Sequence, residues 1–172
     1  MYNIGEYVRY KSGTICCVKE IKKMKFAGMD ERMYYVLSAV NDEKSVNYVP
    51  VDCKEIDKKV KRLLTAEEID EVISETEGMH GEWVEDSRER AVKFEEILGA
   101  GDRAKILWVL KKLAIYKKEL ETQKRKMYAS DARILSTAER MIKEEFAFVL
   151  GIDKEEVAGY IKGKIERAGA GK

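Results

Sequence analysis

The sequence contains few of the residues from which histidine- and cysteine-dependent sites are built. Among its 172 residues there are one histidine, His80, and three cysteines, Cys16, Cys17 and Cys53. Neither a histidine-dependent nucleophile nor a multi-histidine metal site can be built from this set. The cysteines form no C-x-x-C pair, and the adjacent Cys16 and Cys17 would point to opposite faces of a strand. We therefore expect buried structural thiols, rather than a zinc site that combines the cysteines with His80.

Long apolar runs are also missing, and the first residues do not resemble a signal peptide. No run approaches the length that a membrane span requires, and Met1 leads into YNIGEYVRY without the basic start and apolar core of a signal peptide. We therefore expect a cytoplasmic protein without membrane contact. No carboxylate pair is marked as a general acid and base, and no glycine loop follows a strand, so neither an enzyme nor a cofactor is expected.

The net charge of +1 hides a segregation of charge along the chain. Residues 1–64 carry 13 basic and 9 acidic side chains, residues 65–100 carry 3 and 12, and residues 101–172 carry 17 and 11. Within the last region, Arg103–Lys126 holds nine Lys or Arg residues against two Glu residues. Such a basic patch suits a polyanion, although a lysine-rich, solvated helix face has the same composition.

Short runs of β-branched and aromatic residues with tight turns between them predict strands in the first 64 residues. The expected strands are Glu6–Tyr10, Thr14–Ile21, Met33–Val40 and Ser45–Val51. Pro50 lies late in its strand, which favours a sheet edge or a strand end. Four or five strands of this length predict a small, strongly bent β-barrel of the SH3 or Tudor type.

From residue 65 onwards the apolar spacing is helical, and capping residues indicate where helices begin. Thr65 and Glu68 form a capping box for a helix that ends near Gly78. Four further helices are expected to start at Asp86 or Ser87, at Asp102, at Ser130 or Asp131, and at the Asp153–Glu156 box. The fold class is thus predicted as α+β, with a β domain at 1–64 and a helical bundle at 65–172, of which 65–78 form the first helix and linker.

Two tryptophans in the helical part are candidates for contact with nucleic acid. Trp83 lies among acidic residues just before the second helix and must be buried or meet a partner. On the third helix, 100° per residue places Trp108 with Lys105, Lys111 and Lys112 on the side opposite the apolar residues. Trp108 is therefore predicted to stand on an exposed basic face, where it could stack on a base. The alternatives are packing of Trp83 between the two domains, and of Trp108 against the last helix or the β domain.

Several segments resemble the CarD/CdnL family of bacterial transcription regulators. They are IGEYVRYKSGTICCVKEI, YYVL, SVNYVPV and KFEEILGAGD, and YASDARILSTAERMIKEEFAFVL is similar to the penultimate helix of the family. The N-terminal domain of this family is shared with the RNA-polymerase-interaction domain of transcription-repair coupling factors. The resemblance implies a Tudor-like domain that pairs a strand with the RNA polymerase β subunit, and a helical domain that lies against promoter DNA at the upstream edge of the transcription bubble.

The resemblance also implies which residues make these contacts. The polymerase contacts would be Lys22, Lys23, Met24 and Lys25 at the end of a strand, and Val46, Asn47 and Tyr48 on another strand. Trp83 would contact the minor groove at the upstream fork of the bubble and hinder its collapse. Phosphates would be held by Arg88, Arg90 and Lys93, and no base sequence would be read. The further DNA-binding candidates Lys105, Trp108, Lys111 and Lys112 come from the basic helix face, and the resemblance does not mark Trp108.

Two other functions stay open. An adaptor that binds polymerase without productive DNA contact would show no salt-dependent DNA binding, whereas a regulator that stabilises the open promoter complex would lose DNA affinity as salt rises. A thiol redox role for Cys16 and Cys17 would require that their replacement by serine abolishes function without unfolding the protein.

Overall fold

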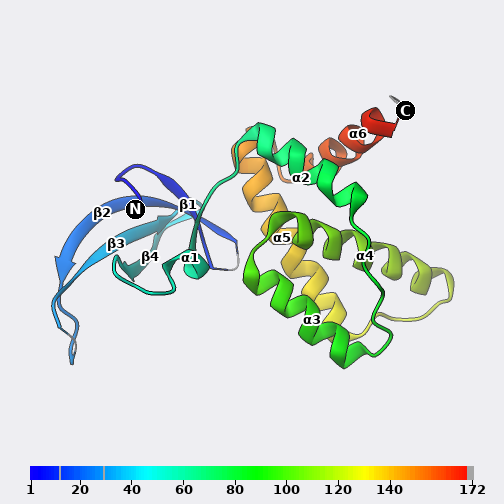
Figure 1. Cartoon of the computed structure of the whole chain (residues 1–172), viewed down its shortest axis with the longest axis horizontal. Helices are drawn as coiled ribbons and strands as arrows, with labels where there is room; N and C mark the ends of the chain where they lie inside the picture. Colours follow the sequence, from blue (N-terminus) through cyan, green and yellow to red (C-terminus); the bar gives the residue numbers. More distant parts are fainter. Residues whose placement is uncertain (12, 29, 170–172) are drawn as a thin grey trace. The chain divides into compact units, whose positions relative to one another are not determined.

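The computed structural model describes residues 1–11, 13–28 and 30–169, and the chain divides into two units, Met1–Leu63 and Leu64–Lys172 (Figure 1). The first unit holds a five-stranded antiparallel sheet, and helices α2 to α6 follow in the second. The predicted α+β class is confirmed. The predicted closure into a barrel is not, because the strand order β4-β3-β2-β1-β5 leaves β4 and β5 as open edges.

The sheet contains the four strands that the sequence predicts and one more. Its elements are β1 (Tyr7–Tyr10), β2 (Thr14–Met24), β3 (Arg32–Ala39), β4 (Asp42–Pro50), α1 (Ile56–Lys59) and β5 (Val60–Arg62). Strand β5 pairs with β1 through Val60, Lys61 and Arg62. A three-residue strand with one β-branched residue carries no alternating pattern, so only its pairing with β1 reveals it.

Strand β2 is bent near its middle. The register of the β2–β3 ladder shifts between Val18 and Glu20, which leaves an extra residue, Lys19, in β2. A bulge of this kind bends its strand and increases the local twist. Before the bulge β2 is buried, and after it β2 is largely exposed, although its β3 partners Tyr34, Tyr35 and Val36 stay buried and only the tip, where Met24 lies opposite Arg32, is exposed on the β3 side.

The core of the first unit lies on one face of the sheet. Its fully buried side chains come from four strands and include Val8, Cys16, Leu37 and Val60. The partly buried side chains packed against them are Tyr2, Tyr10, Ile21, Val51 and Ile56. The N-terminal segment and the connection from β4 to β5 therefore cover this face.

Side-chain caps start three of the helices as the sequence predicts. The helices are α2 (Ala66–Gly78), α3 (Ser87–Ala100), α4 (Arg103–Thr122), α5 (Ala129–Leu150) and α6 (Val157–Gly169). Thr65 Oγ1 accepts from the Glu68 N–H at 3.2 Å, and the Thr65 N–H donates to Glu68 at 2.8 Å. Asp86 accepts from two backbone N–H groups of α3, which lowers the pKa of Asp86. Asp102 caps α4 by accepting from the Lys105 N–H at 3.2 Å.

Helix α5 departs from its prediction. It begins at Ala129, its N-cap Tyr128 makes no side-chain cap, and Asp131 is fully buried instead of capping the helix. Helix α4 ends at Thr122 rather than near Lys126. At the other end of α5, Gly151 takes the expected left-handed conformation, with φ of 65°.

Helix α4 is the central helix of the second unit and contributes to two clusters of buried side chains. Ile106 and Leu107 belong to a cluster shared with α2, α5 and α6. Trp108, Val109 and Leu113 belong to a cluster shared with α3 and α5. A helix that is buried on two sides has no broad solvent-facing stripe along these residues. No helix in the described part of the chain is both long and apolar enough to cross a membrane.

The capping box of α2 gives a direct test of this local structure. Thr65→Ala is expected to lower the free energy of unfolding by about 1 kcal/mol, because it removes the hydroxyl that accepts from the Glu68 N–H. Ser74→Ala, at an exposed position within α2, is the matched control and is expected to change it by less than about 0.5 kcal/mol. Urea unfolding followed by circular dichroism checks both, and equal losses would contradict the assignment.

Candidate functional site

Trp83 lies between α2 and α3 and packs onto the helical unit. Its ring centroid is 4.7 Å from that of Tyr116 on α4 and 6.4 Å from that of Phe94 on α3. The guanidinium carbon of Arg90 lies 4.5 Å from the centre of the Trp83 ring and 5.3 Å from that of Tyr116. These contacts fix the ring by aromatic and cation–π packing, while part of its surface stays exposed.

Arg90 is held by a buried ion pair with Asp131 of α5. The side chains are 1% and 0% exposed, and Arg90 donates to both carboxylate oxygens, Nε to Oδ1 at 3.1 Å and Nη2 to Oδ2 at 2.5 Å. Its Nη1 donates to the carbonyls of Val84 at 2.6 Å and Glu85 at 3.0 Å. Burial alone would lower the pKa of Arg90. The hydrogen bonds and the negative charge of Asp131 raise this pKa by more than burial lowers it, so the net shift is upward and the guanidinium stays charged.

The predicted phosphate contact of Arg90 does not fit this position, because a guanidinium that is 1% exposed cannot reach DNA. The sequence suggested exposure because Arg90 lies between Arg88 and Lys93 on a polar segment. Its partner Asp131 is 41 residues away, so no local pattern could reveal the pairing.

The predicted exposure of Trp108 is also wrong. Its side chain is 7% exposed, and its ring lies 5.9 Å from Phe94 in a T-shaped arrangement. It packs within the helical unit against α3, so the expected stacking on a base is not possible in this conformation. Among the lysines predicted to share a face with Trp108, Lys112 places its Nζ 5.8 Å from the centre of the Trp108 ring.

The segment from Met79 to Asp86, here called the strap, crosses α4 between α2 and α3 (Figure 1). A Cβ atom at Gly81 would lie 2.4 Å from Trp108 Cζ2, so the strap touches the indole where only glycine fits. Further along, Arg90 binds the carbonyls of Val84 and Glu85. The strap is thus held before Trp83 by the contact of Gly81 with Trp108, and after Trp83 by the bonds of Arg90 to the Val84 and Glu85 carbonyls. These two attachments determine the position of the Trp83 ring.

The other predicted phosphate contacts do not gather around Trp83. Lys105 lies near Asp102 at 3.9 Å, and Lys111 pairs with Glu77 of α2 at 2.5 Å. Lys105 is 11 residues before Tyr116, which places it about 16 Å away along the helix axis. Arg88 and Lys93 are exposed on α3 and stay candidates.

A basic surface that the sequence-based choice of residues missed lies beyond Tyr116. We call it the basic end, and it comprises the exposed residues Lys117, Lys118, Lys124, Arg125 and Lys126. None of these five forms an ion pair with another described residue, although Arg125 donates to Gln123. Tyr116, whose ring contacts Trp83, directly precedes Lys117, the first residue of the basic end. The excess of basic residues over Arg103–Lys126 indicated this surface, and the helical spacing placed Lys118 on the basic side, but the residues chosen as candidates were Lys105, Lys111 and Lys112.

A second candidate surface lies on the sheet. Strand β4 is an edge strand, and its side chains Val46 and Tyr48 are 40% and 43% exposed, while Asn47 between them is partly buried. Phe26, which follows β2, packs edge-on against Tyr48 at 5.7 Å and against Tyr34 at 5.1 Å. No local pattern marks Phe26, because only the folding of the β2–β3 hairpin brings it to β4.

The predicted basic residues of β2 lie next to this aromatic group. Lys22 is opposite Tyr34 in the β2–β3 ladder, and Tyr34 is also opposite Pro50 of β4. Lys22 pairs with Glu20 at 2.7 Å, and Lys23 pairs with Glu31 at 2.8 Å. We define the β4 edge surface as the residues Lys22, Lys23, Met24, Lys25, Phe26, Val46, Asn47 and Tyr48.

The cysteines show no feature of a reactive pair. Cys16 is fully buried in the core of the sheet, and burial together with the neighbouring Cys17 raises the pKa of Cys16 to about 11. A thiol with such a pKa is protonated at neutral pH and is a poor nucleophile. Within the described part of the chain, no group of three or more His, Cys, Asp or Glu residues could hold a metal ion.

No protein-family model matches this chain, and no curated protein matches it significantly. The two surfaces described above are therefore the basis for assigning a function.

The strap can be tested at its tightest contact. Gly81→Ala is expected to cost about 1–3 kcal/mol of stability, because the new methyl group would overlap the Trp108 ring. The tryptophan emission should shift to longer wavelength as the strap moves away. Gly99→Ala in α3, where a Cβ meets nothing within 4 Å, is the matched control and should be neutral or slightly stabilising. A Gly81→Ala protein with unchanged emission and stability would show that the strap does not lie on Trp108.

Proposed function

We propose that the chain is a cytoplasmic bacterial transcription regulator of the CarD/CdnL kind, which binds RNA polymerase and upstream promoter DNA and stabilises the open promoter complex. The observation that carries the proposal is the placement of Trp83, which is partly exposed, fixed by its neighbours, and in contact with Tyr116, the residue that precedes the basic end in the chain. A tryptophan held in this way suits contact with an opened base step, because its position is set before DNA arrives.

In this proposal the first unit is a Tudor-like domain that docks on the polymerase β subunit through the β4 edge surface. An edge strand has backbone N–H and C=O groups free to pair with a strand of another chain, and side chains on alternate positions add specificity. Val46 and Tyr48 are two residues apart and therefore share a face of β4. Their exposure and the adjacent Phe26 and Lys25 support docking at this edge.

In the second unit, phosphate contacts are assigned to the basic end together with Arg88 and Lys93. Arg90, which holds Trp83 from inside the protein, acts as a positioning residue. Glu82, Glu85 and Glu89 lie close to Trp83 in the chain, and carboxylates repel phosphates. The affinity for free DNA is therefore expected to be low, with docking on polymerase supplying the effective concentration.

The proposed action is a shift in the equilibrium between closed and open promoter complexes. A ligand that prefers the open state stabilises it by the difference in its affinity for the two states. Each tenfold difference corresponds to about 1.4 kcal/mol, so a single well-placed contact at the fork is enough to change initiation.

The acidic residues of the strap favour one alternative, an adaptor that binds polymerase and makes no productive DNA contact. The two functions share the docking surface and differ in what Trp83 and the basic end do. They are therefore separated by measurements on the helical unit.

The first measurement is the lifetime of competitor-challenged open complexes formed by a bacterial RNA polymerase. The wild-type protein is expected to lengthen the lifetime, and Trp83→Ala is expected to abolish this effect while polymerase binding is retained. Ile115→Ala, which removes an apolar side chain on α4 that is 48% exposed, is the control and should behave as wild type. A Trp83→Ala protein that lengthens the lifetime fully would contradict the role given to Trp83.

The second measurement is the salt dependence of DNA binding at a forked promoter fragment. Each phosphate contact contributes about −0.9 to the slope of log affinity against log salt on duplex DNA. The double variant Lys117→Gln/Lys118→Gln is expected to make the slope less steep by up to about 2. Lys162→Gln, at an exposed position of α6, should leave the slope unchanged. If the wild-type protein shows no salt-dependent binding, even when docked on polymerase, the adaptor is the better description.

A further inference from the structure

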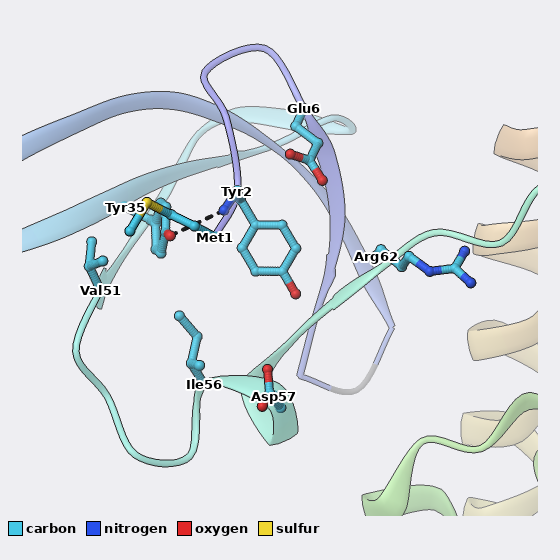
Figure 2. Close-up of a pocket in the computed structure, with 8 residues that line it drawn as sticks. All are labelled: Met1, Tyr2, Glu6, Tyr35, Val51, Ile56, Asp57 and Arg62. Atoms are coloured by element: carbon cyan, nitrogen blue, oxygen red, sulfur yellow. Dashed lines mark hydrogen bonds between the residues drawn. The ribbon is translucent and has the colours of Figure 1, made fainter.

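A pocket of about 510 Å³ opens over the apolar core of the first unit (Figure 2). It lies between the N-terminal segment and the connection from β4 to β5, and none of its lining residues belongs to the β4 edge surface. Its volume is within the range of about 300–1,000 Å³ that small ligand groups occupy in proteins. The proposed function makes no use of this pocket.

The centre of the pocket is the ring of Tyr2, which is held in place at two atoms. The Tyr2 hydroxyl donates to the carbonyl of Val60 at 2.9 Å, and the Tyr2 N–H donates to the hydroxyl of Tyr35 at 3.2 Å. The two rings meet edge to face, with centroids 5.8 Å apart and planes at 72°. Because its hydroxyl is engaged and its ring is fixed, Tyr2 presents an aromatic face to the pocket (Figure 2).

Two carboxylates lie on either side of this ring. Figure 2 shows Glu6 above Tyr2 and Asp57 below it. Glu6 accepts from the Asn3 N–H at 2.8 Å and so has further acceptor capacity. Asp57 is exposed in the first turn of α1, and among the described residues it has no hydrogen-bond or ion-pair partner. The negative charge of Asp57 is thus not neutralised by a salt bridge to another described residue.

The cations near the pocket are directed elsewhere. Arg62 lines it, but its guanidinium points away from Tyr2 and both carboxylates (Figure 2) and donates to the Leu63 carbonyl at 3.0 Å. Lys58 pairs with Glu55 at 3.0 Å, and Lys59 lies 3.7 Å from the sulfur of Cys53. A bound cation would therefore meet none of these three positive side chains, and the remaining positive charge among the lining residues is the α-ammonium of Met1.

We propose that this pocket binds an ammonium group on an aliphatic stem, of the kind carried by a lysine side chain or by a free alkylamine. The ammonium would lie over the face of Tyr2 towards its hydroxyl end, where the quadrupole of the ring attracts a cation, with Asp57 accepting its hydrogen bond and Glu6 adding negative charge at the other end of the side chain. The stem would lie along Val51 and Ile56, which form the apolar part of the wall.

The test is a titration of the full-length, isotope-labelled protein with n-butylammonium, followed by backbone amide shifts in NMR spectra. Saturable shifts centred on Tyr2 and Asp57 are expected. Asp57→Asn is expected to weaken binding at least fivefold. Asp52→Asn is the matched control, because Asp52 is an exposed acid in the same connection that does not line the pocket, and it should leave binding unchanged.

Three results would overturn the proposal. They are the absence of saturable shifts, equal binding by the neutral analogue n-butanol, and wild-type affinity in Asp57→Asn. Two further probes then distinguish the source of the group, a blocked lysine peptide and spermidine. Tighter binding of the peptide than of n-butylammonium, lost when its lysine is acetylated, assigns the pocket to a protein side chain, and tighter binding of spermidine assigns it to a free amine.

Discussion

The buried ion pair between Arg90 and Asp131 is the interaction on which the candidate DNA surface depends. It joins α3 to α5, and the same guanidinium holds two strap carbonyls and lies against the ring of Trp83. Removing one partner of such a pair typically costs about 3–5 kcal/mol, because the other charge is left buried and alone. The Arg90–Asp131 pair therefore holds α3, α5 and the strap in one arrangement. The proposed function depends on one part of that arrangement, the position of the Trp83 ring.

The division into a sheet that docks and helices that meet DNA would place the two tasks on separate units. The β4 edge surface offers backbone groups and exposed aromatic side chains, which suit strand pairing with a protein. The basic end offers charge without base-reading side chains, which suits phosphates of any sequence. The pocket at Tyr2 is a third feature, on the covered face of the sheet, and it would add a contact that neither surface supplies.

Local signals in the sequence predicted the local structure well. Thr65, Asp86 and Asp102 cap helices as expected, because a cap bonds with backbone only two or three residues away. Asp131 has the same local appearance, yet it is buried, because Arg90 lies opposite it on a neighbouring helix. Trp108 shows the same limit, since the helical period cannot indicate that α3 covers a second side of α4. The candidate Trp83 could therefore be chosen from the sequence, whereas the residues that hold it in place are visible only in the tertiary structure.

The most direct test of this account is fluorine NMR of the protein labelled with 5-fluorotryptophan, which gives one resonance for Trp83 and one for Trp108. In Asp131→Asn, where Arg90 loses its charged partner, the Trp83 resonance should move towards the value of an exposed indole, while that of Trp108 should change much less. A folded Asp131→Asn protein whose Trp83 resonance is unchanged would contradict the claim that the buried pair positions Trp83.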